Sequence, residues 1–128
     1  MRILLDTHAL IWFLTDSPKL PTKIRALLLA EDSELFFSSV SVLEVAIKHS
    51  LKPDLMPCLP EEVRSFAESS AICELAFESR HAVKIGELPW LHRDPFDRML
   101  IAQAMCEELN LLSHDENVIR YGGSIIGF

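Results

Sequence analysis

The chain has 128 residues, of which 49% are hydrophobic, and its formal net charge is −7. This length and composition predict one globular domain over residues 1–128 and exclude a disordered chain. The acidic balance argues against a general nucleic-acid binder, because such proteins carry a basic excess.

Targeting and redox signals are few. The three cysteines form no CxxC pair, so neither a zinc site nor a disulfide framework is indicated. Asp6 interrupts the first apolar run, and no apolar run approaches the roughly 20 residues of a membrane span. We therefore expect a soluble, cytoplasmic protein with no membrane partner.

Short apolar runs alternate with helical patterns along the chain. In chain order, the expected strands are 2–5, 35–39, 72–75, 110–113 and 124–126. The expected helices are 9–14, 21–30, 42–49, 61–69, 79–86 and 95–109, followed by one helical turn at 116–120. This alternation predicts an α/β fold in which helices cover both faces of a central, mainly parallel β-sheet.

Three helix starts carry capping signals. Thr7 is expected to cap the first helix and Ser41 the third. Asp94 is a good N-cap, and Pro95 suits the first helical position that follows. This last helix is apolar on most sides, yet its first turn also carries Asp97. A buried helix with a charged first turn suggests a functional site.

Four acids lie where parallel sheets form their sites, just beyond the carboxyl ends of strands. Asp6 directly follows the first strand, and Asp115 follows the fourth. Glu44 and Asp97 each lie one turn into a helix. If the strands are neighbours, the four carboxylates meet in one cleft, where they raise one another's pKa.

A hard divalent cation removes this conflict between like charges. Mg²⁺ and Mn²⁺ favour carboxylate and water oxygens, whereas zinc favours His and Cys clusters, which these positions lack. Such an ion lowers the pKa of a bound water and offsets charge on a phosphate, which is the chemistry of phosphodiester hydrolysis. The pattern therefore predicts an Mg²⁺ or Mn²⁺ site held by the four acids.

Most of these acids also have a purely structural interpretation. Ser41 and Glu44 have the spacing of a capping box, in which Glu44 only satisfies a backbone N–H. An acid at Asp97 suits the helix dipole, and Asp115 suits an N-cap. Asp6, at the end of a buried strand, is the hardest of the four to explain by structure alone.

The chain resembles the PIN domains, and specifically the VapC-type toxins of bacterial toxin–antitoxin systems. The resemblance covers nearly the whole chain, and its last two stretches together are the most specific. The matching stretches are 4–12 (LLDTHALIW), 38–48 (SSVSVLEVAIK), 88–89 (LP) with 92–104 (HRDPFDRMLIAQA), and 111–115 (LLSHD).

This resemblance implies a PIN-like three-layer α/β/α fold and an Mg²⁺- or Mn²⁺-dependent endoribonuclease acting on structured RNA such as tRNA or rRNA. It implies catalytic, metal-holding acids at positions that match Asp6, Glu44, Asp97 and Asp115. It also implies a homodimer and a tight complex with a VapB-type antitoxin, which blocks the site and represses the operon. DNA is then contacted only indirectly, through the antitoxin.

The chain departs from the family pattern in three places. Leu43 stands where related sequences often have Trp, and the loop 51–55 lacks the usual Gly. Ser113 stands where related sequences often have Thr. Because Ser113 keeps the hydroxyl, a supporting role beside the metal ligands remains open to it.

Basic residues near the expected site are candidates for contact with phosphate. They are Lys48, Arg93 and Arg98. The alternative is that they are solvated or pair with Asp94.

Aromatic residues near the site are less specific. His8 and His92 are candidates to contact substrate or order a ligand, although a structural, hydrogen-bonded role is the stronger expectation for each. Trp12 offers a stacking surface, but an aromatic residue on a helix more often lies in the core or at a dimer interface.

Two other functions are weighed against the nuclease. A catalytically inactive PIN-like module would bind RNA or protein without cleavage, but all four acids are present. A signalling receiver also has acids at strand ends, and it needs a paired acidic cluster and a Lys after a later strand. Here the corresponding strand ends read Ser38-Ser39 and His114-Asp115, with no Lys.

Overall fold

Five strands form the central sheet. In the computed structural model, which describes all residues from 1 to 128, they are β1 (Arg2–Leu5), β2 (Glu34–Ser38), β3 (Cys73–Leu75), β4 (Asn110–Ser113) and β5 (Ile125–Gly127). Their order across the sheet is β3-β2-β1-β4-β5, and all four pairings are parallel. The carboxyl ends of the strands therefore share one edge of the sheet, and the connections change direction between β1 and β4.

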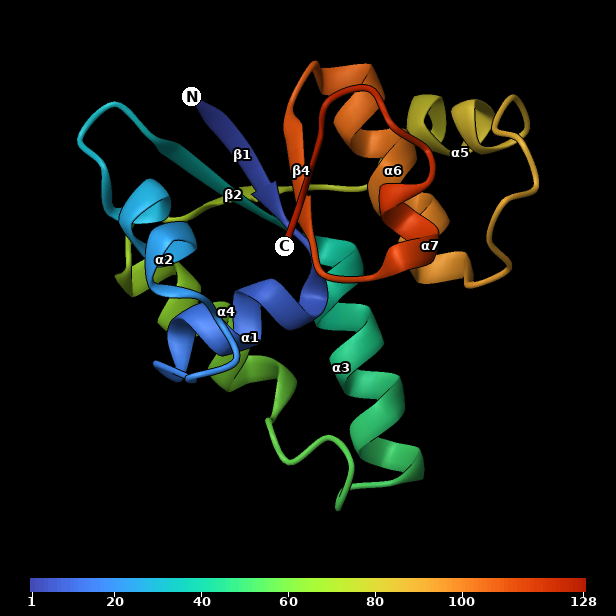
Figure 1. Cartoon of the computed structure of the whole chain (residues 1–128). Coiled ribbons are helices and arrows are strands. Elements are labelled where there is room, and N and C mark those ends of the chain that lie inside the picture. The colour runs from blue at the N-terminus through green and yellow to red at the C-terminus, as the bar shows by residue number, and fades with distance from the viewer.

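Seven helices connect and cover the strands (Figure 1). They are α1 (Thr7–Leu14), α2 (Thr22–Leu29), α3 (Ser39–Leu51), α4 (Pro60–Ser69), α5 (Ser79–Ile85), α6 (Pro95–Glu107) and α7 (Glu116–Ile119). Helices α1, α2 and α4 lie on one side of the sheet, and α5, α6 and α7 lie on the other, while α3 extends away from the carboxyl edge. The expected three-layer α/β/α architecture is confirmed.

Successive side chains of a strand point to opposite faces of the sheet, and this alternation divides the hydrophobic core into two clusters. Ile3 and Leu5 of β1 join one cluster with residues of α1, α2 and α4. Leu4, between them, joins the other cluster with residues of α6 and α7. All three side chains are fully buried, which contributes roughly 1.5–3 kcal/mol each to folding. The sheet is thus anchored on both faces, and its carboxyl edge is held rigidly.

Two helix starts differ from the sequence-based prediction. Asp6, not Thr7, caps α1, because its Oδ1 accepts a 2.8 Å hydrogen bond from the Ala9 N–H. Ser38, not Ser41, caps α3, which begins directly at the strand end. Ser41 consequently lies inside the helix, and the predicted capping box does not form.

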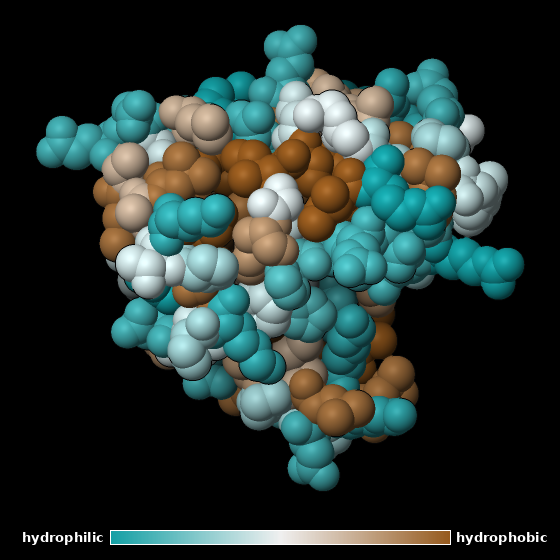
Figure 2. Space-filling model, in the orientation of Figure 1, coloured by the Kyte–Doolittle hydropathy of each residue, from teal (hydrophilic) through white to brown (hydrophobic).

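Exposed apolar side chains gather in two areas of the face drawn in Figure 2. One is a band across its upper part, and the other lies at its lower end, near the end of α3. On α3, Leu43, Ile47 and Leu51 are 46%, 39% and 75% exposed, and their spacing of four residues puts them on one side of the helix. Apolar stripes of this kind often mark interaction surfaces. No helix combines the length and apolar character needed to cross a membrane.

Candidate active site

An open, acidic cleft of about 470 Å³ lies at the carboxyl edge of the sheet. It is lined by Asp6, His8, Trp12, Glu44, Lys48, Asp94, Asp97, His114, Asp115, Glu116 and Asn117. The structure thus places all four acids predicted from the sequence around one cleft. They come from the end of β1, from α3, from the first turn of α6 and from the end of β4.

Asp6 lies at the floor of the cleft and is only 5% exposed. Burial is the main reason why its pKa is raised to about 6. Hydrogen bonds from the Ser113 hydroxyl and the Ala9 N–H act in the opposite direction, and the charges of Glu44 and Asp115 raise the pKa further. Ionisation of Asp6 is therefore less favourable here than in water, and a positive charge in the cleft would favour it.

Glu44 is held by both of its oxygens. The Thr7 hydroxyl donates a 2.7 Å hydrogen bond to Oε1 and is also hydrogen-bonded to Ser41, 2.9 Å away. The Lys48 ammonium, one helical turn further on, pairs with Oε2. Burial lowers the pKa of Lys48, but its bond to Glu44 and the nearby aspartates of α6 outweigh this and raise it. Lys48 accordingly stays charged beside Glu44, which fixes the carboxylate in place.

Asp97 shares its corner of the cleft with His92 and Asp94. Nε2 of His92 lies 2.7 Å from Oδ2 of Asp97, and Oδ1 of Asp94 accepts a 3.0 Å bond from the Asp97 N–H. Burial raises the pKa of Asp97 to about 6; the His92 bond opposes this, and the charges of Asp94 and Asp6 add to it. Asp94 is the N-cap, as predicted, and it also lines the cleft, although the sequence analysis did not count it among the candidate metal ligands.

Asp115 and Ser113 link the end of β4 to the floor of the cleft. Oδ1 of Asp115 accepts a 2.8 Å bond from the Asn117 N–H, so Asp115 caps α7 and lines the cleft at once. Ser113 is fully buried; its hydroxyl accepts a 3.1 Å bond from the Asp115 N–H and lowers the pKa of Asp6. Ser113 thus lies between two of the candidate acids.

The two candidate arginines occupy different environments. Arg98 is only 4% exposed, and its guanidinium donates to the carbonyls of Pro89 and Ile85 and to the Tyr121 hydroxyl at 3.0–3.2 Å. The suggested phosphate contact of Arg98 does not fit this placement, since its donors already hold the loop before α6. Arg93 is exposed and makes no ion pair, so of the two alternatives to a phosphate contact it is solvated and not paired with Asp94.

Aromatic side chains form one side of the cleft. Trp12, which the sequence assigned to the core or a dimer interface, is half-buried and lines the cleft with His8 and His114. The four-residue spacing of His8 and Trp12 on α1 was a usable signal that they share a face. The sequence carried no such signal for His114, because its contact with Trp12 depends on how α1 packs beside the end of β4.

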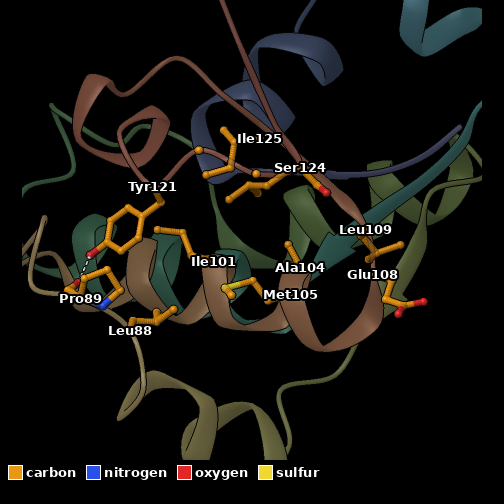
Figure 3. Close-up of a pocket in the computed structure, with 13 residues that line it drawn as sticks. Leu88, Pro89, Ile101, Ala104, Met105, Glu108, Leu109, Tyr121, Ser124 and Ile125 are labelled. Carbon is orange, nitrogen blue, oxygen red and sulfur yellow. Dashed lines mark hydrogen bonds between the residues drawn. The ribbon is translucent and has the colours of Figure 1, made fainter.

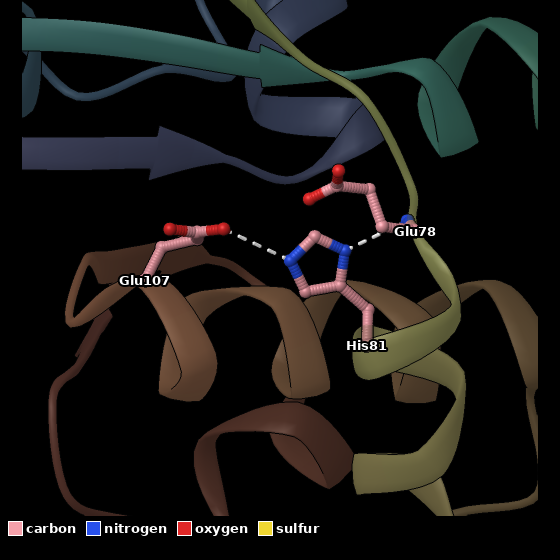
Figure 4. A group of neighbouring side chains, drawn as sticks. All are labelled: Glu78, His81 and Glu107. Carbon is pink, nitrogen blue, oxygen red and sulfur yellow. Dashed lines mark hydrogen bonds and ion pairs between the residues drawn. The ribbon is translucent and has the colours of Figure 1, made fainter.

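A second cluster of possible metal ligands is structural (Figure 4). The buried His81 accepts a 2.9 Å bond at Nδ1 from the Glu78 N–H, and its Nε2 lies 3.0 Å from Glu107. The His81 bond is the main reason why the pKa of Glu107 is lowered, with Arg80 adding to the effect. Both ring nitrogens are occupied within the protein, so this cluster ties α5 to α6 and leaves none for an ion.

The largest apolar hollow lies away from the acids. It measures about 380 Å³ and is enclosed by α6 and the segment 121–125 (Figure 3). Ile101 and Met105 of α6 face Tyr121 and Ile125 across it, and the Tyr121 hydroxyl donates to the Pro89 carbonyl at 2.9 Å. Glu108 and Tyr121 are the only titratable residues of its lining, and the Tyr121 hydroxyl is already hydrogen-bonded, so the hollow holds no cluster of groups for acid–base or metal chemistry.

The acidic cleft has the donor set of a hard cation. Its potential ligands are six carboxylates and the imidazoles of His8 and His114, and Cys ligands are lacking. The ligand atoms of His92, Asp94 and Asp97 lie within 4.8 Å of one another, and no other acid of the cleft belongs to that group. An open set of this kind suits Mg²⁺, which keeps several waters and binds directly to few carboxylates.

The fold and the cleft together define an α/β protein with acids gathered at the switch point of a parallel sheet. The model of the PIN domain family matches residues 3–124. The chain therefore belongs to the PIN domain family, and PIN domains are in general nucleases that usually use divalent metals. This assignment rules out the signalling receiver.

Solved structures with the same fold come from toxin–antitoxin complexes. VapBC2 from Rickettsia felis, bound to a DNA fragment from its promoter, is 18% identical with a TM-score of 0.70, over 100% of this chain and 98% of that one. VapBC-1 from nontypeable Haemophilus influenzae is 15% identical with a TM-score of 0.66, over 100% of this chain and 97% of that one. DNA-bound VapBC from Salmonella typhimurium is 18% identical with a TM-score of 0.66, over 99% of this chain and 98% of that one. Comparison with curated proteins gives no match.

Proposed function

We propose that residues 1–128 form one catalytic unit, a metal-dependent endoribonuclease that is the toxin of a VapBC-type toxin–antitoxin system. The observation that carries this proposal is the gathering of Asp6, Glu44, Asp97 and Asp115 around one cleft, with the pKa of two of them raised to about 6. Carboxylates whose pKa is raised by burial and by one another's charge are stabilised in their ionised form by a divalent cation.

These four acids would hold Mg²⁺ or Mn²⁺. When bound, the ion lowers the pKa of a water and offsets charge on the scissile phosphate. The protein's own part is to fix the ligands: Thr7 and Lys48 hold Glu44, and His92 holds Oδ2 of Asp97, which leaves Oδ1 without a protein partner. Such bonds to metal ligands set their orientation before the ion binds.

The proposed substrate is structured RNA, of the tRNA or rRNA type. A net charge of −7 gives no broad basic surface, so recognition would depend on local contacts and RNA shape. Arg93 is the exposed basic residue nearest in sequence to the cleft acids of α6 and is our candidate for a phosphate contact. Lys48 also lines the cleft, although Glu44 partly neutralises it.

The proposed partners are a second copy of the chain and a VapB-type antitoxin. The similar structures are VapBC complexes by name, two of them with DNA, and an exposed apolar stripe runs along α3. DNA contact would pass through the antitoxin, because this acidic chain offers DNA no basic face. An RNA substrate would place the protein in the cytoplasm.

The decisive experiment is cleavage of total bacterial RNA by antitoxin-free protein with Mn²⁺, with the cut ends mapped by sequencing. We expect one or a few discrete cuts, lost on addition of EDTA and in Asp6→Asn protein. Cuts that persist in Asp6→Asn protein would contradict the assigned site. Metal binding without cleavage of any RNA would instead favour a catalytically inactive PIN-like module that binds RNA or protein.

A further inference from the structure

Lys48 is the only lysine or arginine that lines the acidic cleft. It follows Glu44 by four residues, so both side chains lie on the same side of α3. The ammonium pairs with Oε2 of Glu44, whose side chain is 4% exposed, whereas that of Lys48 is 39% exposed. One built-in cation therefore already lies among six carboxylates, namely those of Asp6, Glu44, Asp94, Asp97, Asp115 and Glu116.

Glu44 differs from the other candidate ligands because both of its oxygens have a protein partner. The Thr7 hydroxyl donates a 2.7 Å hydrogen bond to Oε1, and Lys48 occupies Oε2. In Asp97, by contrast, His92 contacts Oδ2 and leaves Oδ1 without a partner. A divalent ion that bound Glu44 directly at Oε2 would have to displace the ammonium or lie beside another positive charge.

The ammonium of Lys48 also interacts with the acids of α6, across the cleft. Burial lowers the pKa of Lys48, but its bond to Glu44 and the charges of Glu44, Asp94 and Asp97 outweigh this and raise it. Acids from two helices thus act on the same positive charge. A cation that bridges α3 and α6 would experience the same field, so Lys48 already supplies charge that an ion would otherwise supply.

This charge limits how many divalent ions the cleft can hold. Two-metal sites place their ions about 3.5–4 Å apart, where the ions repel each other strongly unless several carboxylates offset them. Here Lys48 neutralises Glu44, and its own charge would repel an ion beside it. Asp6, Asp97 and Asp115 remain, which suits one Mg²⁺, because this ion binds directly to few carboxylates.

We propose that Lys48 is the resident counter-ion of the cleft and takes the place of a second divalent cation, so that the site binds one ion. This inference rests on the proposed metal-dependent function and specifies how the same site is charged. Glu44 would then support the ion through one of the waters that Mg²⁺ keeps. Lys48 is a positioning residue in this proposal, because it acts on the ion through Glu44.

Counting bound Mn²⁺ tests the proposal without RNA and without an activity assay. The EPR signal of free Mn²⁺ reports the ions that stay unbound when antitoxin-free protein is titrated at pH 7.5. We expect one bound ion per chain in the unmodified protein and two in Lys48→Met protein, since Glu44 regains a free oxygen and its full charge. The first ion should also bind about tenfold more tightly in this variant, because a nearby positive charge is removed.

Three further variants separate the position of the charge from its mere presence. Lys48→Arg keeps a cation four residues after Glu44 and should still bind one ion. Lys48→Gln removes the charge but keeps a polar side chain, and it should bind two. Lys52→Met is the matched control, because Lys52 is exposed, makes no ion pair and lies outside the cleft. It changes the net charge by the same amount as Lys48→Met and should still bind one ion.

Unfolding gives a second readout of the same relationship. In EDTA, Lys48→Met protein should unfold at a lower urea concentration than the unmodified protein, because the buried Glu44 loses its cation. Mn²⁺ should then raise the unfolding midpoint of the variant by more than that of the unmodified protein, because two ions bind the folded state instead of one. An equal rise in both proteins would contradict the counter-ion role.

The ion count also separates failure of this inference from failure of the proposed function. One bound ion in both the unmodified and the Lys48→Met protein would overturn the inference, and so would two ions in the unmodified protein or in Lys52→Met protein. If the unmodified protein nevertheless cleaves RNA with Mn²⁺, the nuclease function stands. Absence of both bound Mn²⁺ and cleavage would reject the inference together with the proposed function.

Discussion

The Thr7 hydroxyl donates a 2.7 Å hydrogen bond to Oε1 of Glu44, which joins the first residue of α1 to a carboxylate on α3. Both side chains are buried, at 3% exposure each. Because Lys48 holds the other oxygen, Glu44 has a partner at each end of its carboxylate. The geometry of this candidate ligand therefore depends on a residue that does not itself line the cleft.

Thr7→Val should show this dependence. The change keeps the shape of the side chain but leaves Oε1 of Glu44 without its donor, which we expect to cost about 1–3 kcal/mol of unfolding free energy. RNA cleavage should fall as well, because the carboxylate loses its fixed orientation. Urea unfolding and a cleavage assay measure the two effects. Thr7→Ser keeps the hydroxyl and should retain most of both; equal behaviour of the two variants would contradict the assigned role.

Stability without metal should depend on pH through Asp6. Its folded-state pKa of about 6 lies above the unfolded value near 3.8, so between these pH values the folded state binds more protons. Stability should therefore be highest near pH 4, fall as the pH rises to about 6 and stay low above it. Asp6→Asn should raise the unfolding free energy at pH 7 by up to about 3 kcal/mol, with the gain vanishing towards pH 4.

The matched control for this pH effect is Asp54→Asn. Asp54 is exposed and makes no ion pair, so its replacement should shift stability by less than about 0.5 kcal/mol at any pH. Chemical denaturation of both variants in EDTA, from pH 4 to pH 8, gives the comparison. A gain for Asp6→Asn that is constant over this range would rule out ionisation of Asp6 as its cause.

Mg²⁺ should stabilise the protein more at pH 7.5 than at pH 5. The pKa values of Asp6 and Asp97, both about 6, mean that the cleft is largely ionised only at the higher pH. At 100 times the dissociation constant, a bound ion adds about 2.7 kcal/mol. Thermal melts with Mg²⁺ and with EDTA measure this. The shift should be small in Asp97→Asn protein, and a full shift in that variant would place the ion elsewhere.

Substitution of Arg98 should affect stability, whereas substitution of Arg93 should affect RNA binding. Arg98→Met leaves the carbonyls of Pro89 and Ile85 without a buried donor, so the unfolding free energy should drop by about 2–4 kcal/mol. Arg93→Met changes an exposed side chain and should leave stability within about 0.5 kcal/mol while weakening RNA binding. Denaturation and RNA binding, measured on both variants, separate the structural arginine from the candidate phosphate contact.

Ser113→Ala should shift the pH dependence of RNA cleavage. The Ser113 hydroxyl lowers the pKa of Asp6, so its removal raises that pKa further above 6. The acidic limb of the cleavage profile should then move to higher pH, because Asp6 must be ionised to hold a cation. Ser113→Thr keeps the hydroxyl and should leave the profile in place. A profile that moves equally in both variants would point to a packing effect instead.

The sequence was informative about the fold because short apolar runs and capping residues are local signals. Alternating elements predicted the parallel sheet and its two helical layers, and the Asp94–Pro95 pair predicted the start of α6. The starts of α1 and α3 were predicted late. Thr7 and Ser41 look like caps in sequence, but the Thr7 hydroxyl is bonded to both Ser41 and Glu44 in a buried contact that only tertiary structure creates.

The sequence by itself determined which acids follow the strands, because a parallel sheet sends every strand end to one edge. Only the tertiary structure decided how the neighbours of those acids are used. It turned Arg98 inward to hold a loop, placed Asp94 in the cleft, and brought His114 against Trp12 from a strand end about 100 positions away. Such contacts depend on how helices pack on the sheet, and residue spacing along the chain carries no record of that packing.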